Sequence, residues 1–101
     1  METSHVRVLT LQIHKETSGL YLAEVLWDRT LVTDPERYVS ITEAIQTEAG
    51  AVPEGFAYFM EIRYQDLSSG TMSLENARLQ AREVADRLVS LAREVYLTAG
   101  A

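Results

Sequence analysis

The residues that could perform acid–base or metal chemistry are few in this chain. It contains two histidines, His5 and His14, and no cysteine. The two histidines are nine positions apart on one predicted strand, so their side chains point to opposite faces. They therefore cannot bind one metal ion together within a single molecule, and we expect no metal site and no other cofactor. The missing cysteines exclude disulfides and thiol catalysis.

Glu24 is the carboxylate best placed for acid–base chemistry, because it interrupts a row of leucines on a predicted strand. Burial among them would favour its protonated form and suit it to act as a general acid or base. Pairing with an arginine on a neighbouring strand is the more common arrangement for a buried charge. With Trp27 and Tyr58, Glu24 could also line a small-ligand pocket between the sheet and a long helix, although aromatic residues at strand spacing usually belong to a core.

No sequence motif indicates an enzyme. The glycines are isolated, so the chain has no phosphate-binding loop, dinucleotide fingerprint or nucleophile elbow. Other carboxylates, at Asp28, Asp34 and Glu36, fall in predicted turns, where they commonly bind backbone groups. We therefore predict no catalytic residue, and a protein that is not an enzyme is favoured over the alternative of an enzymatic domain.

Composition limits the possible partners. The chain of 101 residues fits one domain, 1–101, and its net charge of −6 argues against nucleic-acid binding, which needs a basic surface. Residues 1–70 hold eleven acidic and five basic residues, whereas residues 73–101 hold four of each.

The N-terminus does not read as a secretory signal, and no apolar run is long enough to span a membrane. We expect a cytoplasmic protein without membrane contact.

Alternating apolar residues predict three strands, over residues 5–15, 20–27 and 56–66, and a possible short strand within 29–33. Gly19 can supply the positive φ of the turn between the first two strands. In the last strand, Phe56, Tyr58, Met60, Ile62 and Tyr64 would form a core face, with Ala57 and Phe59 on the opposite side. Residues 67–72 are expected to form a flexible connection.

Two helices are predicted. Ser40 and Glu43 form a capping box for a short helix at about 41–49, although residues 38–42 could instead belong to a strand. Ser73 is a suitable N-cap for a long helix that reaches Leu97 with one apolar face. The resulting fold class is α+β, an antiparallel sheet of three or four strands with the long C-terminal helix packed across one face.

The second face of that sheet has more apolar residues than a solvated face should have. The short helix could cover only part of it, so we expect a second copy of the chain to cover the rest as a homodimer. The alternative is that the strand pairing differs and the chain covers its own sheet. The predicted interface residues come from the strands and from the long helix: Val6, Val8, Leu20, Leu22, Leu26, Phe59, Val89 and Tyr96.

The segment from Gly19 to Ile45 resembles the start of HicB-type antitoxins. It contains GLYLAEV, then a short polar stretch, then SITEAI. This resemblance covers about a quarter of the chain, and the sequence departs from the pattern after Gly50, where another strand and a longer helix follow. The resemblance implies a dimer that binds a small RNA-cleaving toxin.

Three hypotheses follow for the function. The first is a small non-catalytic protein-interaction module that acts as a homodimer. The second is a small-ligand-binding or enzymatic α+β domain with its pocket between sheet and long helix. The third, an antitoxin-like protein that binds a different partner, is a special case of the first.

Overall fold

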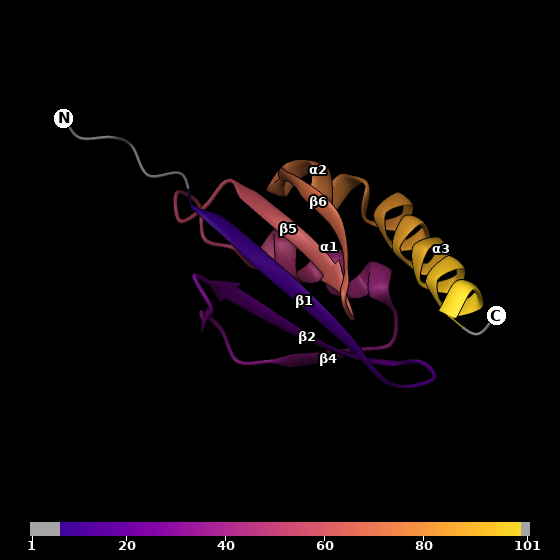
Figure 1. The fold of residues 1–101 in the computed structure, drawn as a ribbon. Helices are drawn as coiled ribbons and strands as arrows, with labels where there is room; N and C mark the ends of the chain where they lie inside the picture. The colour runs from indigo at the N-terminus through magenta and orange to yellow at the C-terminus, as the bar shows by residue number, and fades with distance from the viewer. Residues whose placement is uncertain (1–6, 100–101) are drawn as a thin grey trace.

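The structure, a computed structural model, describes residues 7–99 of the chain. In this part, three helices lie on one side of a six-stranded sheet (Figure 1). The elements in chain order are β1 (Val8–Thr17), β2 (Leu20–Trp27), β3 (Thr30–Leu31), β4 (Glu36–Tyr38), α1 (Ile41–Ala51), β5 (Phe59–Tyr64), β6 (Leu67–Ser73), α2 (Leu74–Leu79) and α3 (Ala81–Ala99). The α+β class is confirmed.

The sheet is mixed, and the prediction of a purely antiparallel sheet of three or four strands was wrong. Its strand order is β3-β2-β1-β5-β6, with β4 also paired to β2. The central pair, β1 and β5, is parallel, with Leu9 opposite Met60 and Leu11 opposite Ile62. A parallel pair requires a crossover between its strands, and α1 provides the helix of this crossover.

Strand β6 was predicted as a flexible connection. It pairs antiparallel with β5, with Met72 opposite Met60 and Thr71 opposite Glu61. The loop between the two strands has only two residues, and one of them, Gln65, has a φ of 54°. The residues of β6 are mostly small and polar, as an edge strand allows, so the sequence carries no apolar alternation that would have indicated a strand.

Two turns before α1 use the left-handed backbone region. Gly19, with a φ of 77°, joins β1 to β2, as predicted. Asp28 and Arg29, with φ values of 55° and 70°, form the two-residue connection between β2 and β3. Positive φ at both positions is the geometry of a type I′ turn, which glycine adopts at little cost and other residues adopt with strain.

Both predicted helix starts are confirmed by hydrogen bonds. The Ser40 hydroxyl accepts a hydrogen bond from the backbone N–H of Glu43 at 3.0 Å, and the Ser73 hydroxyl accepts one from Asn76 at 3.1 Å. Residues 38–42 divide between the end of β4 and the start of α1, with Ser40 as the cap.

The predicted long helix is interrupted at one residue, Gln80, where α2 ends and α3 begins. The N–H of Gln80 still donates to the carbonyl of Asn76, and the N–H of Val84 donates to the carbonyl of Gln80. The chain therefore bends between α2 and α3 while hydrogen bonds continue on both sides. This bend was not predicted, because the apolar spacing continues through it.

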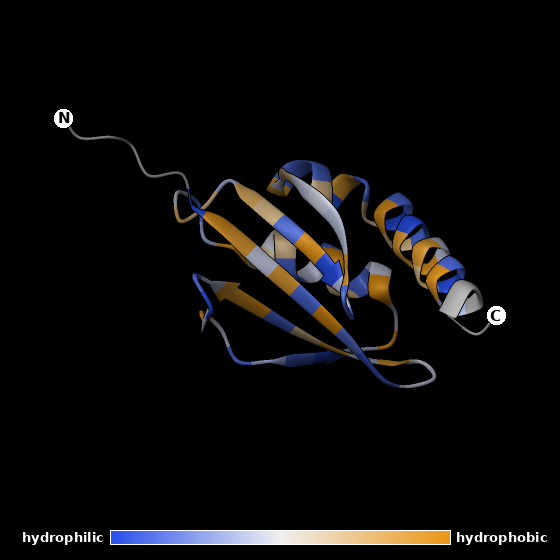
Figure 2. Cartoon of the chain, viewed as in Figure 1, coloured by the Kyte–Doolittle hydropathy of each residue, from blue (hydrophilic) through white to orange (hydrophobic). Residues whose placement is uncertain are grey.

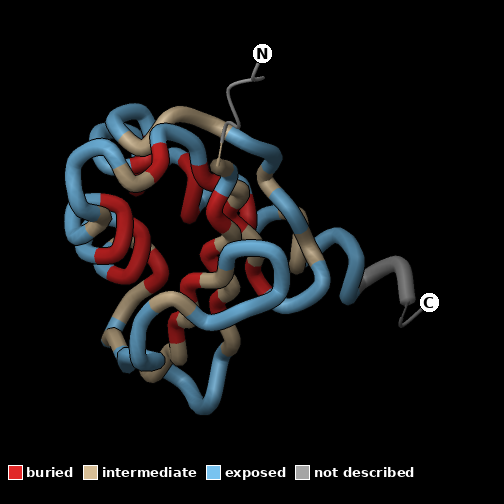
Figure 3. The backbone as a smooth tube through the Cα atoms, turned by 90° about the vertical axis from the view of Figure 1, so that its left-hand side faces the viewer, coloured by how far each residue is buried: buried red, intermediate tan, exposed pale blue. Residues whose placement is uncertain are grey.

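All three helices pack on the same face of the sheet, which corrects the predicted placement of the short helix. Helix α1 contacts β1 and β2, and α3 contacts α1 and the edge strand β6. The core lies between them, and in Figure 3 the buried segments face one another across the interior. The fully buried side chains of the sheet and helices include Leu9, Leu11, Ile13, Ile45, Met60, Ile62, Val84 and Leu88. The opposite sheet face is left without any cover from residues 7–96 of the chain.

Residues 56–58 do not belong to β5, in contrast to the prediction. The strand begins at Phe59, after a turn-rich segment that follows Pro53. Ala57, predicted on the second sheet face, is instead buried in the core, and Tyr58, predicted in the core, is 64% exposed. Further along the strand, Met60, Ile62 and Tyr64 are buried as expected, and the alternation of apolar and polar residues is visible in Figure 2.

Candidate functional site

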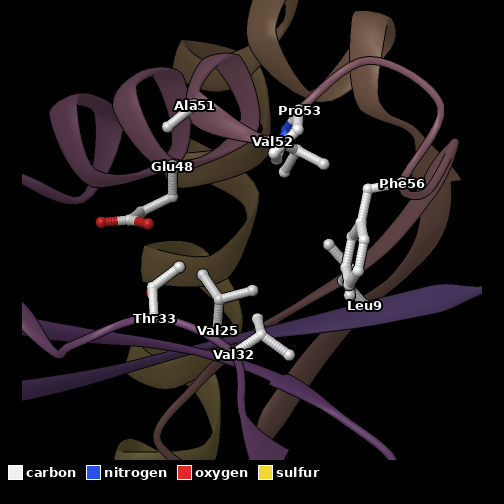
Figure 4. Close-up of a pocket in the computed structure, with 9 residues that line it drawn as sticks. All are labelled: Leu9, Val25, Val32, Thr33, Glu48, Ala51, Val52, Pro53 and Phe56. Carbon is white, nitrogen blue, oxygen red and sulfur yellow. The ribbon is translucent and has the colours of Figure 1, made fainter.

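A cavity of about 220 Å³ lies between the C-terminal part of α1 and the sheet. Its walls are mostly apolar, and Figure 4 shows α1 on one side and the strands on the other. The lining residues are Leu9, Val25, Val32, Thr33, Glu48, Ala51, Val52, Pro53 and Phe56. Thr33, Ala51 and Pro53 are exposed, so the cavity opens to solvent.

Glu48 provides the only ionisable side chain in this lining. The residue is 7% exposed, and it is the only charged residue in the described part of the chain that is buried to this degree. In Figure 4 it reaches from α1 toward Thr33 at one end of the cavity, while Phe56 and Leu9 lie at the other end. The cavity is therefore polar at one end and apolar at the other.

Tyr38, at the end of β4, holds the Glu48 carboxylate by a short hydrogen bond of 2.5 Å from its hydroxyl to Oε2. Burial raises the pKa of Tyr38 above its ordinary value, and the hydrogen bond to Glu48 raises it further. The negative charges of Glu48, Glu36 and Glu43 act in the same direction, because they oppose formation of a tyrosinate. Tyr38 therefore remains a hydrogen-bond donor at neutral pH.

The sequence analysis missed both residues of this pair. A signal for Glu48 was available, because it falls on the same helical face as Ile41, Ala44 and Ile45, all of which are buried. A carboxylate on an apolar helix face requires a local partner. The partner could not be found from the sequence, because Tyr38 belongs to a short strand that is paired only with β2.

The three residues of the predicted pocket lie apart. Glu24 is opposite Gln12 on the uncovered sheet face, where its Oε1 is 3.4 Å from Nε2 of His14. Trp27 is an odd number of residues further along β2 and so points to the other face. Tyr58 is in the segment before β5 and borders a shallow surface depression beside α2. The partner of Glu24 is a histidine and not the arginine that was considered.

Trp27 takes part in a stacked cluster near the start of β1. Its ring meets the ring of Phe56 edge-on, with centroids 6.2 Å apart. The Arg7 guanidinium lies 4.7 Å from the centroid of Trp27 and 4.6 Å from that of Phe56. Arg7 also donates a hydrogen bond to the carbonyl of Phe56 at 2.9 Å. Since Phe56 lines the cavity, this cluster forms the outer side of its apolar end.

The predicted interface residues separate into two surfaces. Val8, Leu22, Leu26 and Phe59 lie on the uncovered sheet face, Leu20 begins β2, and Val6 lies outside the described residues. Val8 is directly opposite Phe59, and Leu26 is opposite Leu31, so apolar side chains gather at one end of this face.

The middle of the uncovered sheet face is polar and largely satisfied by its own contacts. Arg63 Nη1 lies 3.2 Å from Oε2 of Glu61, which also accepts a hydrogen bond from the Ser68 hydroxyl at 2.7 Å. Because these polar side chains already have partners, this part of the sheet can face water and does not need another protein surface to cover it. The face is mixed, and less apolar than the sequence pattern indicated.

The second surface is the C-terminal half of α3. Its apolar stripe is buried at Val84 and Leu88, and it continues to Val95, which is 52% exposed. Tyr96, seven residues after Val89, is 79% exposed. Figure 3 shows this end of the helix extending away from the buried segments. The apolar stripe of α3 therefore continues beyond its buried residues to the exposed Val95.

No protein-family model, no curated protein and no solved structure matches this chain. The resemblance to HicB-type antitoxins stays a prediction.

Two further findings concern residues 7–99. This region contains no group of three or more His, Asp or Glu side chains placed to hold a metal ion. None of its helices combines the length and the apolar character that crossing a membrane requires.

Proposed function

We propose that this protein is a non-catalytic interaction module that forms a homodimer through the C-terminal half of α3. The observation that carries the proposal is the change along one helical stripe, from Leu88, which is fully buried, to Val95, which is half exposed, with the more exposed Tyr96 beside it. Exposed apolar surface that continues a core stripe is typical of a contact with another molecule.

The charge distribution favours a second copy as the partner. The chain has a net charge of −6, which would oppose association of two copies through an acidic surface. Helix α3 is different, because its first fourteen residues contain three arginines and three acidic residues. Two such helices can approach each other without net repulsion, and their mixed charges can pair across a two-fold axis.

The size of the stripe determines the expected strength of association. The stripe consists of a few turns of one helix. We therefore expect two copies to bury less than the roughly 1,200 Å² of total area that a stable interface buries. We therefore expect a dimer that dissociates on dilution. A toxin-like or other protein partner, as in the antitoxin hypothesis, would bind the same stripe in place of the second copy.

Analytical ultracentrifugation over a range of protein concentrations tests this proposal. The wild type should change from monomer to dimer as concentration rises, and Val95→Asp should remain monomeric. Ser90→Asp is the matched control, because it adds the same charge on the opposite, exposed side of α3 and should dimerise normally. A wild type that stays monomeric at millimolar concentration would contradict the proposal.

A further variant distinguishes the two apolar surfaces. Leu31→Asp places a charge at the apolar end of the uncovered sheet face, beside Leu26. If this variant dissociates the dimer and Val95→Asp does not, the dimer forms through the sheet and the assignment to α3 is wrong.

A second candidate function is the binding of a small ligand. The cavity below α1 favours it, because one end carries a buried carboxylate and the rest is apolar. This cavity is in a different place from the pocket that the sequence indicated.

A further inference from the structure

The charge of Glu48 has no cationic counterpart within the described part of the chain. The ion pairs found there join His14 to Glu24, Arg37 to Glu16 and Arg63 to Glu61, and none includes Glu48. Among residues 7–96, the only side chain that contacts the carboxylate through a hydrogen bond is Tyr38, through its neutral hydroxyl. Buried carboxylates are normally paired with a cation, because removal from water is costly for an unbalanced charge.

The position of Glu48 in its helix adds to this imbalance. It lies in the last turn of α1, which contains no basic residue. The free carbonyl groups of a helix C-terminus carry partial negative charge, so this position favours a cation and disfavours a carboxylate. Two independent features of the cavity, the buried side chain and the helix end, therefore call for positive charge at the same place.

One oxygen of Glu48 remains available to a ligand. Oε2 accepts the hydrogen bond from Tyr38, and Oε1 accepts none from residues 7–96. In the same residues, every fully buried side-chain oxygen or nitrogen has a hydrogen-bond partner. Oε1 therefore keeps contact with accessible space, and Glu48 belongs to the cavity lining.

We propose that this cavity binds a small organic cation, an amine with an apolar body about the size of one aromatic ring. The ammonium group would contact Oε1 of Glu48 at the end of the cavity that Thr33 lines, and the apolar body would extend toward Phe56. The volume of about 220 Å³ suits this size, since an apolar cavity of about 150 Å³ is sufficient for benzene. An anion would be repelled by Glu48 and by the helix C-terminus.

Three probes of nearly equal size test the proposal on the wild-type protein: benzylamine, benzyl alcohol and benzoate. Isothermal titration calorimetry should show benzylamine binding about tenfold more tightly than benzyl alcohol, because a hydrogen bond between charged groups is stronger than a neutral one. Benzoate should not bind. Equal affinities for benzylamine and benzyl alcohol, or no binding of benzylamine at 10 mM, would overturn the proposal.

Glu48→Gln separates the charge from the shape of the site. Glutamine can still accept the hydrogen bond from Tyr38, so the variant should bind benzyl alcohol as the wild type does and should lose the tenfold preference for benzylamine. The matched control is Glu54→Gln, which removes an equal charge from an exposed position just after Pro53, outside the cavity lining. If both variants weaken benzylamine binding equally, the amine responds to net charge and not to this site.

Ala51→Leu tests the location of the ligand without altering Glu48. The larger side chain would occupy part of the cavity beside α1, and it is compatible with the helix. Benzylamine and benzyl alcohol should both lose affinity, while circular dichroism remains unchanged. Unchanged affinity in Ala51→Leu would place the ligand elsewhere and overturn the assignment.

Trp27 provides a second way to measure binding. It is the only tryptophan, and its contact with Phe56 should make its fluorescence respond to binding in the wild type.

Discussion

The hydroxyl of Tyr38 donates a hydrogen bond to Oε2 of Glu48, and this contact joins the last residue of β4 to the last turn of α1. The two residues are ten positions apart, and of the two only Glu48 lines the cavity. The contact satisfies one oxygen of a buried carboxylate and fixes the position of the other. We therefore expect both the stability of the fold and the binding properties of the cavity to depend on this contact.

Tyr38→Phe should destabilise the protein at neutral pH. The variant leaves Oε2 of Glu48 without its donor, and loss of a hydrogen bond to a charged group costs about 1.5–3 kcal/mol. Urea unfolding at pH 7 measures the free-energy difference. Tyr58→Phe is the control, because Tyr58 is exposed and its hydroxyl should contribute little. Equal effects of the two substitutions would contradict a structural role for the contact.

The same residue should make stability sensitive to alkaline pH. The pKa of Tyr38 in the folded protein lies above the ordinary value of about 10, chiefly because of burial. Above about pH 10 the unfolded chain loses a proton that the folded chain keeps, so the stabilisation present at lower pH decreases by at most about 1.4 kcal/mol per pH unit. Burial also raises the pKa of Tyr64, so Tyr64 contributes to the same loss of stability in both the wild type and Tyr38→Phe. The free energy of unfolding, measured by urea denaturation from pH 8 to 11, should fall less steeply with pH in Tyr38→Phe than in the wild type. Identical slopes would contradict the prediction.

Arg29→Gly should stabilise the protein by about 0.5–1 kcal/mol, because Arg29 has a φ of 70° in the turn between β2 and β3. Glycine removes this strain, although it also makes the unfolded chain more flexible. Gly19→Ala is the opposite experiment, since Gly19 has a φ of 77° and nothing lies near its missing Cβ. Thermal unfolding should show a gain for the first variant and a loss of about 1 kcal/mol for the second. A loss in both would mean that the Arg29 side chain contributes to stability.

Leu88→Ala and Val95→Ala should differ strongly, although both residues lie on the apolar stripe of α3. Leu88 is fully buried, so its truncation should cost about 2–5 kcal/mol. Val95 is half exposed, and its truncation should cost less than about 0.5 kcal/mol in dilute solution. Urea unfolding at low protein concentration measures both. A large cost for Val95→Ala under those conditions would show that the monomer buries this residue.

Arg7→Lys should weaken the cluster at the apolar end of the cavity. Lysine keeps the charge and loses the planar group that contacts the rings of Trp27 and Phe56, at a cost of about 1 kcal/mol. The fluorescence of Trp27 should shift toward the emission of an exposed indole. Arg82→Lys, on the exposed side of α3, is the control and should change neither property. An unchanged spectrum in Arg7→Lys would contradict the contact.

The sequence by itself determined the local elements that depend on short-range chemistry. Alternation placed Met60, Ile62 and Tyr64 on the core face of β5, since successive side chains of a strand point to opposite sides. The two serine caps were read from hydroxyl groups that bind backbone N–H groups three residues later. The apolar face of α3 followed from helical spacing, and the α+β class followed from the order of these elements.

Only the tertiary structure decided how those elements meet. The parallel pairing of β1 with β5 depends on the path of α1 over the sheet, and no local pattern records it. For the same reason α1 occupies the centre of the covered face, where the long helix was expected. The Glu48–Tyr38 contact and the cavity follow from this arrangement. Spacing along the chain specifies which face of an element is apolar, whereas the partner of that face is chosen by packing between residues that are distant in the sequence.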